Sequence, residues 1–302
     1  MEKMRFEQFA EEVVGKIREF LPESFAHASV ELQTVTKNND LKLTGLTIRS
    51  GDSNICPTIY LEAFYDEYQA GKDMGKILSN IADARIRHEV SDTFDVTQIT
   101  DFEKVRSCIV PRIIGMKWNT ELLKGRPYKQ VGDLAVTYHI MLKQDESETA
   151  SSPITNNLLE YWEVDIDMLH DLAIMNMQEL LPGQFQTMGS VLGSLLESDD
   201  EIMDMVMMDQ RMFIITNDKK SNGAAAILDE KLMQSIIEKI GEDFYLLPSS
   251  VHEWILIKAT DDVDVSALNI MVNEVNESQV APDERLSDHA YRYTLKEGLV
   301  TA

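Results

Sequence analysis

Residues 211 to 257 read RMFIITNDKKSNGAAAILDEKLMQSIIEKIGEDFYLLPSSVHEWILI and hold the densest run of ordered-structure signals in the chain. A short β-branched apolar run, Met212 to Thr216, predicts a buried strand. Turn-forming residues follow it, and the small residues of Ala224 to Leu228 then fit a second strand beneath a closely packed helix. This part of the stretch therefore predicts two successive strands.

The remainder of the stretch predicts a helix and two more strands. Asp229 is a suitable N-cap and Gly241 a suitable C-terminal stop for a helix with one apolar face. Phe244 to Leu247 predicts a strand that ends at Pro248, because proline cannot donate to a β-ladder. Trp254 to Ile257 predicts the last strand of the group.

The segments on either side extend this pattern. Asp264 to Asn276 predicts a helix whose inward face carries Val265, Leu268, Met271, Val272 and Val275. Val30 to Thr36 and Leu41 to Ile48 predict a hairpin that turns at Asn38-Asn39-Asp40. Strand pairs that alternate with single helices predict an α+β fold with mixed or antiparallel sheets.

Length and charge both suggest two regions. The chain has 302 residues, and the polar loop from Gln144 to Ser152 is its weakest point. We therefore expect an N-terminal α+β region, 1–150, and an acidic C-terminal α+β region, 151–302, which either fold separately or share one core. The first carries 19 Lys+Arg and 24 Asp+Glu, and the second carries 9 and 28, so their net charges are −5 and −19.

The acidic half restricts the class of partner. Phosphate backbones repel such a surface, so direct nucleic-acid binding is not expected. Three readings stay open: a surface that keeps the chain in solution, an acidic face for a basic protein partner, and mimicry of nucleic acid. Residues 197–212 combine carboxylates with Met203, Met205, Met207 and Met208, and clustered methionine either fills a core or adapts to varied binding surfaces.

The compartment is expected to be the cytoplasm. The N-terminal sequence is amphipathic and acidic rather than a basic start followed by an apolar segment, so it does not resemble a signal peptide. No run reaches the roughly 18 apolar residues of a membrane span, so no membrane association is expected. Cys56 and Cys108 are the only cysteines, which does not make a disulfide framework.

Two polar groups of residues are weak candidates for catalysis. Ser249, Ser250, His252 and Glu253 place hydroxyls near an imidazole, the minimum for an activated nucleophile, and Asp288 is a candidate for the missing orienting acid. The alternative is that Ser250 and His252 cap backbone ends and form local hydrogen bonds, since the chain lacks the G-x-S-x-G elbow.

Asp288 and His289 form the second group, within Ser287-Asp288-His289 and close to Tyr291 and Tyr293. Adjacent side chains point in different directions, so these two are not expected to form a dyad with each other. The alternative is a C-terminal segment that its tyrosines anchor to the sheet.

No cofactor or metal is expected from the motifs. The histidines are widely spaced, no C-x-x-C pair occurs, and both phosphate-binding glycine motifs are absent from the sequence.

Four strings give the chain a family resemblance. They are VTKNNDLKLTGLTI (35–48), PTIYL (57–61), FYLLPSSVHEWIL (244–256) and LSDHAYRY (286–293). On these the chain resembles an uncharacterised bacterial family, domain of unknown function 5688, over essentially its whole length. The resemblance implies no activity, substrate, cofactor or catalytic residue.

The sequence by itself leaves the function open. The leading hypothesis is a cytoplasmic, non-enzymatic interaction or regulatory protein that acts through its acidic C-terminal half. The alternatives are a small hydrolase or transferase that uses Ser249 or Ser250 with His252, and a nucleic-acid mimic.

Overall fold

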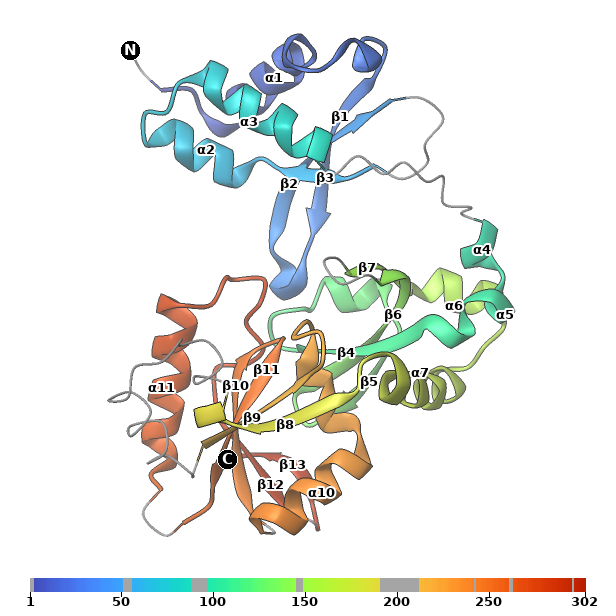
Figure 1. Cartoon of the computed structure of the whole chain (residues 1–302), viewed down its shortest axis with the longest axis vertical. Coiled ribbons are helices and arrows are strands. Elements are labelled where there is room, and N and C mark those ends of the chain that lie inside the picture. The colour runs from blue at the N-terminus through green and yellow to red at the C-terminus, as the bar shows by residue number, and fades with distance from the viewer. Residues whose placement is uncertain are drawn as a thin grey trace. The chain divides into compact units, whose positions relative to one another are not determined.

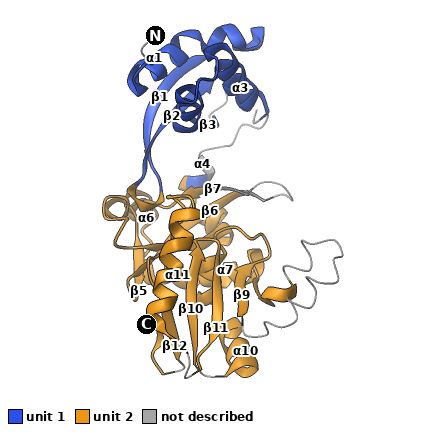
Figure 2. Ribbon diagram, turned by 90° about the vertical axis from the view of Figure 1, so that its left-hand side faces the viewer, with its two compact units in different colours: residues 1–37, 41–99 blue, residues 38–40, 100–302 orange. Residues whose placement is uncertain are grey.

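The computed structural model describes residues 3–50, 56–87, 97–144, 149–190, 212–241, 243–260, 263–294 and 296–302 (Figure 1). The chain forms two compact units, which Figure 2 distinguishes by colour. Unit 1 comprises residues 1–37 and 41–99, and unit 2 comprises residues 38–40 and 100–302. Residue 150, where the sequence suggested a division, lies in strand β7 (Thr149–Pro153) inside unit 2. No helix in the described part of the chain is both long and apolar enough to cross a membrane.

Unit 1 is a three-stranded antiparallel sheet with helices packed on it. The strands follow the order β1 (Ser29–Thr36), β2 (Lys42–Arg49) and β3 (Thr58–Tyr60), so the predicted hairpin is confirmed. Its helices are α1 (Phe6–Lys16), η1 (Ile17–Phe20), η2 (Glu23–Phe25), α2 (Glu62–Gln69) and α3 (Met74–Arg87), and the short helix α4 (Thr97–Thr100) falls where the units divide.

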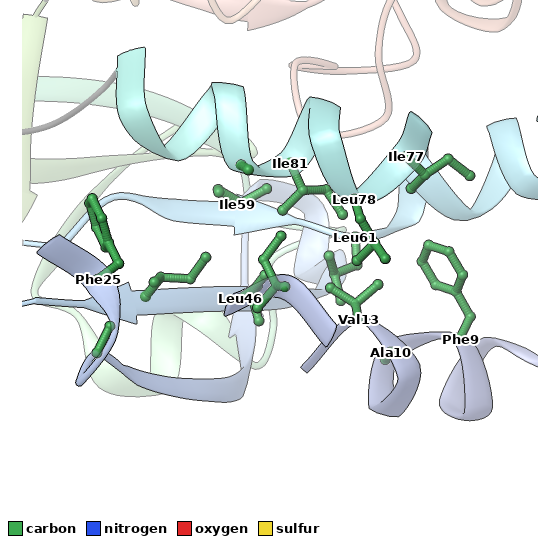
Figure 3. Packing of buried hydrophobic residues seen from close by; sticks show 14 residues of the cluster. Phe9, Ala10, Val13, Phe25, Leu46, Ile59, Leu61, Ile77, Leu78 and Ile81 are labelled. Carbon is green, nitrogen blue, oxygen red and sulfur yellow. The ribbon is translucent and has the colours of Figure 1, made fainter. Parts of the chain in front are cut away.

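The core of unit 1 lies between the sheet and helices α1 and α3. Phe9 and Val13 of α1, Leu46 of β2 and Ile77 and Ile81 of α3 are all fully buried and point toward one another (Figure 3). Their helical spacing of three or four residues gives each helix one apolar stripe, which removes apolar surface from water.

Unit 2 holds two antiparallel sheets. The larger has six strands in the order β13-β12-β10-β11-β9-β8, namely β8 (Gly183–Thr187), β9 (Met212–Asn217), β10 (Phe244–Ser250), β11 (Glu253–Lys258), β12 (Tyr291–Thr294) and β13 (Gly298–Thr301). The smaller has the order β4-β6-β5, with β7 also paired to β6, and its strands are β4 (Ile109–Gly115), β5 (Tyr128–Val131), β6 (Leu134–Gln144) and β7.

The helices of unit 2 are mostly short, and an Asp or Thr side chain caps four of them, α6, α7, α10 and α11. They are η3 (Asn38–Asp40), α5 (Phe102–Val105), η4 (Arg106–Cys108), η5 (Leu122–Gly125), α6 (Asn156–Trp162), α7 (Ile166–Leu180), η6 (Gly223–Leu228), α10 (Glu230–Ile240) and α11 (Val265–Ser278). The Asp229 side chain accepts a hydrogen bond from the Lys231 backbone N–H, which confirms the predicted cap of α10. All described strand pairs are antiparallel, so the predicted α+β class is confirmed.

Three local predictions are wrong. Ala224 to Leu228 forms the 3₁₀ helix η6 rather than a strand, because the Trp254 indole N–H donates to Ala224 O at 2.9 Å and holds the turn over the sheet. Strand β10 continues through Pro248, which pairs with Trp254, and becomes irregular only before Ser250.

The third correction concerns α11. Met271 and Val275 face solvent, whereas Leu268 and Val272 are buried against Leu247. A 14-residue helix over one sheet face has room for a narrow apolar stripe only, so apolar residues outside that stripe stay exposed.

Candidate functional site

The β10–β11 turn carries four of the predicted site residues. Ser249 Oγ donates a hydrogen bond to Glu253 Oε1 at 3.2 Å, whereas Ser250 Oγ accepts one from the His252 backbone N–H at 3.0 Å. Both hydroxyls therefore bond within the turn, which is the local alternative that the sequence left open.

The His252 imidazole bonds to two other segments. The Asn222 backbone N–H donates to Nδ1 at 2.9 Å, so Nδ1 is the unprotonated nitrogen. Nε2 lies 3.3 Å from Glu284 Oε1 and carries the proton of the neutral ring. Because both nitrogens are occupied, this imidazole is not placed to take a proton from Ser249 or Ser250.

A hydroxyl, an imidazole and a carboxylate meet instead at His289. Its Nδ1 lies 3.2 Å from Ser287 Oγ and 3.0 Å from Asp288 Oδ1. The expectation that Asp288 and His289 do not pair is therefore wrong, because the backbone ahead of β12 lets both side chains turn to the same side. Its Nε2 is buried, makes no hydrogen bond within the described residues, and lies 3.4 Å from Asp133 Oδ2. Asp133 was not among the sequence-predicted residues, since it lies at the start of β6 and only the fold brings it to His289.

Charge and burial set the protonation of this His289 cluster, defined as Lys117, Asp133, Asp288, His289 and Tyr291. Burial by itself raises the pKa of Asp288, but hydrogen bonds from Lys117 at 2.7 Å and from His289 outweigh it, so the pKa lies below its ordinary value. Burial raises the pKa of Tyr291, whose hydroxyl donates to Asp133 Oδ1 at 2.8 Å. The cluster thus joins the start of β12 to Asp133.

Access limits what the His289 cluster does chemically. Ser287 is only 5% exposed, and its hydroxyl lies within hydrogen-bond distance of the His289 imidazole. The adjacent depression is lined by Lys117, Asp133, Ser287 and Asp288 among others. An acyl transfer needs a nucleophile that a substrate reaches, and the small exposed fraction of Ser287 restricts that access. No hydrogen bond or ion pair in the described structure links 249–253 to 287–289.

Metal ligands do not gather in the described part of the chain. No group of three His, Cys, Asp or Glu side chains there is arranged to hold a metal ion. Cys56 and Cys108 are half-buried free thiols. The predicted methionine-rich acidic stretch, 197–212, lies outside the described residues except for Met212.

The exposed face of α11 carries three exposed apolar side chains. Ile270, Met271 and Val275 are 60%, 45% and 37% exposed. Glu274 and Glu277 of the same helix are exposed as well. Figure 2 shows α11 lying along the six-stranded sheet as an outer layer, so its other side faces solvent. We call these five residues the α11 surface. Of the five, Met271 and Val275 were predicted to face the core.

Comparisons with known proteins give a family and nothing further. No curated protein matches the chain, and no solved structure does. A protein-family model described as a family of unknown function, DUF5688, matches residues 6–294. Because that match covers nearly the entire sequence, the chain belongs to the DUF5688 family, as its four strings suggested.

Proposed function

We propose that this protein is a non-enzymatic interaction protein whose acidic C-terminal half binds a basic protein partner through the α11 surface. The observation that carries the proposal is the adjacency of three exposed apolar side chains, Ile270, Met271 and Val275, and two exposed carboxylates, Glu274 and Glu277, on one helix. Exposed apolar side chains grouped in this way are typical of binding surfaces.

The stability of the fold does not explain why these exposed positions of α11 carry apolar side chains. The helix is already held to the sheet by Leu268 and Val272, which pack with Leu247 and Ala290. Ile270 and Met271 lie outside that contact and gain little from folding, because burial is what makes apolar side chains stabilising.

The charge around α11 defines the partner. Residues 259–284 contain seven Asp or Glu and no Lys or Arg. An acidic rim attracts a partner rich in Lys and Arg and accelerates its approach, while the apolar centre supplies the area that is removed from water. Met271 suits such a role, because the flexible thioether adapts to the shape it meets.

Helix α7 supplies a matched control surface. Met168 and Met175 are 46% and 57% exposed there, and residues 156–181 also lack Lys and Arg. They are two turns apart with Asp171 between them, so they form no continuous apolar patch. Helix α7 therefore has similar composition and charge without the adjacency of the α11 surface.

A photo-crosslinking amino acid tests the assignment. We expect Met271 replaced by benzoylphenylalanine to crosslink a protein of net positive charge in extracts of cells that make this protein. The same replacement at Met175 is expected to give no such product. Reversal of charge in Glu274→Lys/Glu277→Lys should abolish the crosslink at position 271. Equal crosslinking at both positions, or capture of acidic proteins only, would contradict the proposal.

The hydrolase or transferase alternative has weaker support, and it makes a different prediction. It needs a reactive serine, whereas Ser249 and Ser250 bond within their turn and Ser287 is buried. A serine-directed fluorophosphonate is therefore expected not to label the folded protein. Stoichiometric labelling that disappears in His252→Ala or His289→Ala would favour the enzyme instead.

A further inference from the structure

Three basic side chains gather on the smaller sheet of unit 2. Arg112 of β4 stands opposite Thr137 of β6, and Val110 stands opposite His139, so Arg112 and His139 lie on one face of the sheet. Arg126 precedes β5, the strand on the other side of β6. His139 is 6% exposed, and both arginines are half-buried.

No protein carboxylate neutralises these arginines in the described structure. Arg112 Nη2 donates to Ser151 Oγ at 2.7 Å, and neither Arg112 nor Arg126 forms an ion pair with a described Asp or Glu. Burial, with the nearby Arg126 charge, lowers the pKa of Arg112 to about 10. Burial, followed by the charges of Arg112 and Arg126, holds the pKa of His139 well below its ordinary value.

Unpaired buried charge is costly, so proteins pair such groups or bind a counter-ion. The chain is rich in carboxylates, with 52 Asp and Glu, yet none of those that the structure describes pairs with either arginine. An anion from solution would supply the missing charge.

Beside Arg112 lies a small depression that is partly open to solvent. Its wall includes Arg112, Lys219, Ser221 and Asn222, and the remainder is mainly apolar. Among the described residues, Lys219 Nζ forms an ion pair with Asp218 Oδ2, at the long distance of 4.0 Å. A guanidinium fork, an ammonium, a hydroxyl and an amide are the donors that oxyanions bind in proteins.

The turn on the far side of the depression is fixed in place. Asn217 Oδ1 accepts from the Lys219 and Ser221 backbone N–H groups at 3.1 and 3.3 Å. The Asn222 N–H donates to His252 Nδ1, so the His252 ring helps to hold the turn in place and does not activate a nucleophile. These bonds hold the backbone that carries the side-chain donors, so the turn itself need not be ordered when a ligand binds.

We propose that the depression between Arg112 and the 219–222 turn binds a tetrahedral oxyanion, either inorganic phosphate or the phosphate of a phosphomonoester. Arg112 donates hydrogen bonds to two of its oxygens, and Lys219 contributes a second positive charge. Arg126 adds positive electrostatic potential at the site. The proposal does not depend on the α11 surface, and either one stands if the other fails.

Calorimetric titration of the full chain with inorganic phosphate, at constant ionic strength, tests the site. We expect one phosphate per chain for the wild type and at least a tenfold weaker Kd for Arg112→Gln and for Lys219→Gln. The control is Arg292→Gln, since Arg292 is an exposed arginine that already pairs with Asp243. Phenyl phosphate in a parallel titration distinguishes the two sources: comparable binding favours a phosphomonoester, and its exclusion favours the free ion.

Thermal unfolding separates binding from a purely structural role. Without phosphate, Arg112→Gln is expected to unfold at the wild-type temperature or above, because a half-buried charge that no described carboxylate neutralises has been removed. Phosphate should raise the Tm of the wild type and of Arg292→Gln, but not that of Arg112→Gln. No saturable heat with the wild type, or equal loss of binding in both arginine variants, would overturn the proposal. Should Arg112→Gln fail to fold, Lys219→Gln alone decides the matter.

Discussion

At the residue scale, the two histidines predicted as catalytic candidates differ in what surrounds them. Both nitrogens of His252 are occupied by Asn222 and Glu284, so the ring is structural even though two serines lie beside it in the sequence. His289 contacts its sequence neighbours Ser287 and Asp288 and also a carboxylate far away in the sequence, Asp133. Sequence proximity therefore identified the residue types but not the contact with Asp133, because contacts across strands depend on register and packing.

Removal of Asp133 tests the role of the His289 cluster. Asp133→Ala leaves the buried Tyr291 hydroxyl without its acceptor, so we expect the free energy of unfolding to fall by about 1–3 kcal/mol. Urea denaturation monitored by circular dichroism measures this. Asp243→Ala, which removes an exposed pair with Arg292, is the control and should cost less. Equal losses in both variants would show that the cluster does not fasten β12.

His139 makes a pH-dependent prediction. Its pKa in the folded protein is lowered by burial and by Arg112 and Arg126, whereas the unfolded chain titrates near 6.5. Below pH 6.5 the unfolded state therefore binds a proton that the folded state does not. Stability is lost as the pH falls through that value, with a slope of at most about 1.4 kcal/mol per pH unit.

The measurement is the urea midpoint at several pH values between 5 and 8, in buffers free of phosphate, for the wild type and His139→Gln. The wild type should lose stability relative to the variant as the pH falls below about 6.5. Parallel curves for the two proteins would mean that His139 is protonated in the folded state.

At the element scale, the sequence predicted regular strands and caps well and irregular turns poorly. Strand β9 and the capped helix α10 follow from β-branched and apolar spacing. The helix η6 does not, because its conformation depends on the Trp254 indole and on close packing against β9 and β11. Helix α11 was located correctly, but periodicity alone did not tell which of its apolar residues the sheet would cover.

Two glycines allow opposite predictions. A Cβ on Gly223 would overlap the Thr216 hydroxyl and the His252 carbonyl, so Gly223→Ala should destabilise unit 2 by about 1–3 kcal/mol. Gly15 lies within α1 with nothing near its Cβ position, so Gly15→Ala should stabilise that helix by about 0.5–1 kcal/mol. Native-state hydrogen exchange reports on each segment separately; stabilisation by Gly223→Ala would contradict the packing described for η6.

The two faces of α11 should respond differently to truncation. Leu268→Ala removes a buried side chain and is expected to cost about 2–5 kcal/mol. Met271→Ala, at an exposed position on the same helix, should change stability by less than about 0.5 kcal/mol. Thermal unfolding of both variants checks this difference. A large loss in Met271→Ala would mean that the α11 surface is part of the core and not free for a partner.

At the scale of the whole molecule, net charge distinguishes the C-terminal half of the sequence, and we propose that this half binds the partner. The two compact units divide the chain after residue 99 instead of near residue 150. The reason is that β7 pairs with β6 as a hairpin, so the polar loop near residue 150 joins two strands of one sheet. Composition identifies polar loops, but long-range pairing decides whether such a loop separates units or closes a hairpin.

The account depends most on the α11 surface and its charge. The direct test is the Kd of the basic protein that crosslinks at position 271, measured with the wild type, with Glu274→Lys/Glu277→Lys, and with Glu160→Lys/Glu163→Lys as an equally charged control near α7. We predict that binding weakens at least tenfold in the first variant, changes far less in the second, and weakens further with added salt. Equal affinities for the two variants would contradict the claim that α11 is where this protein meets its partner.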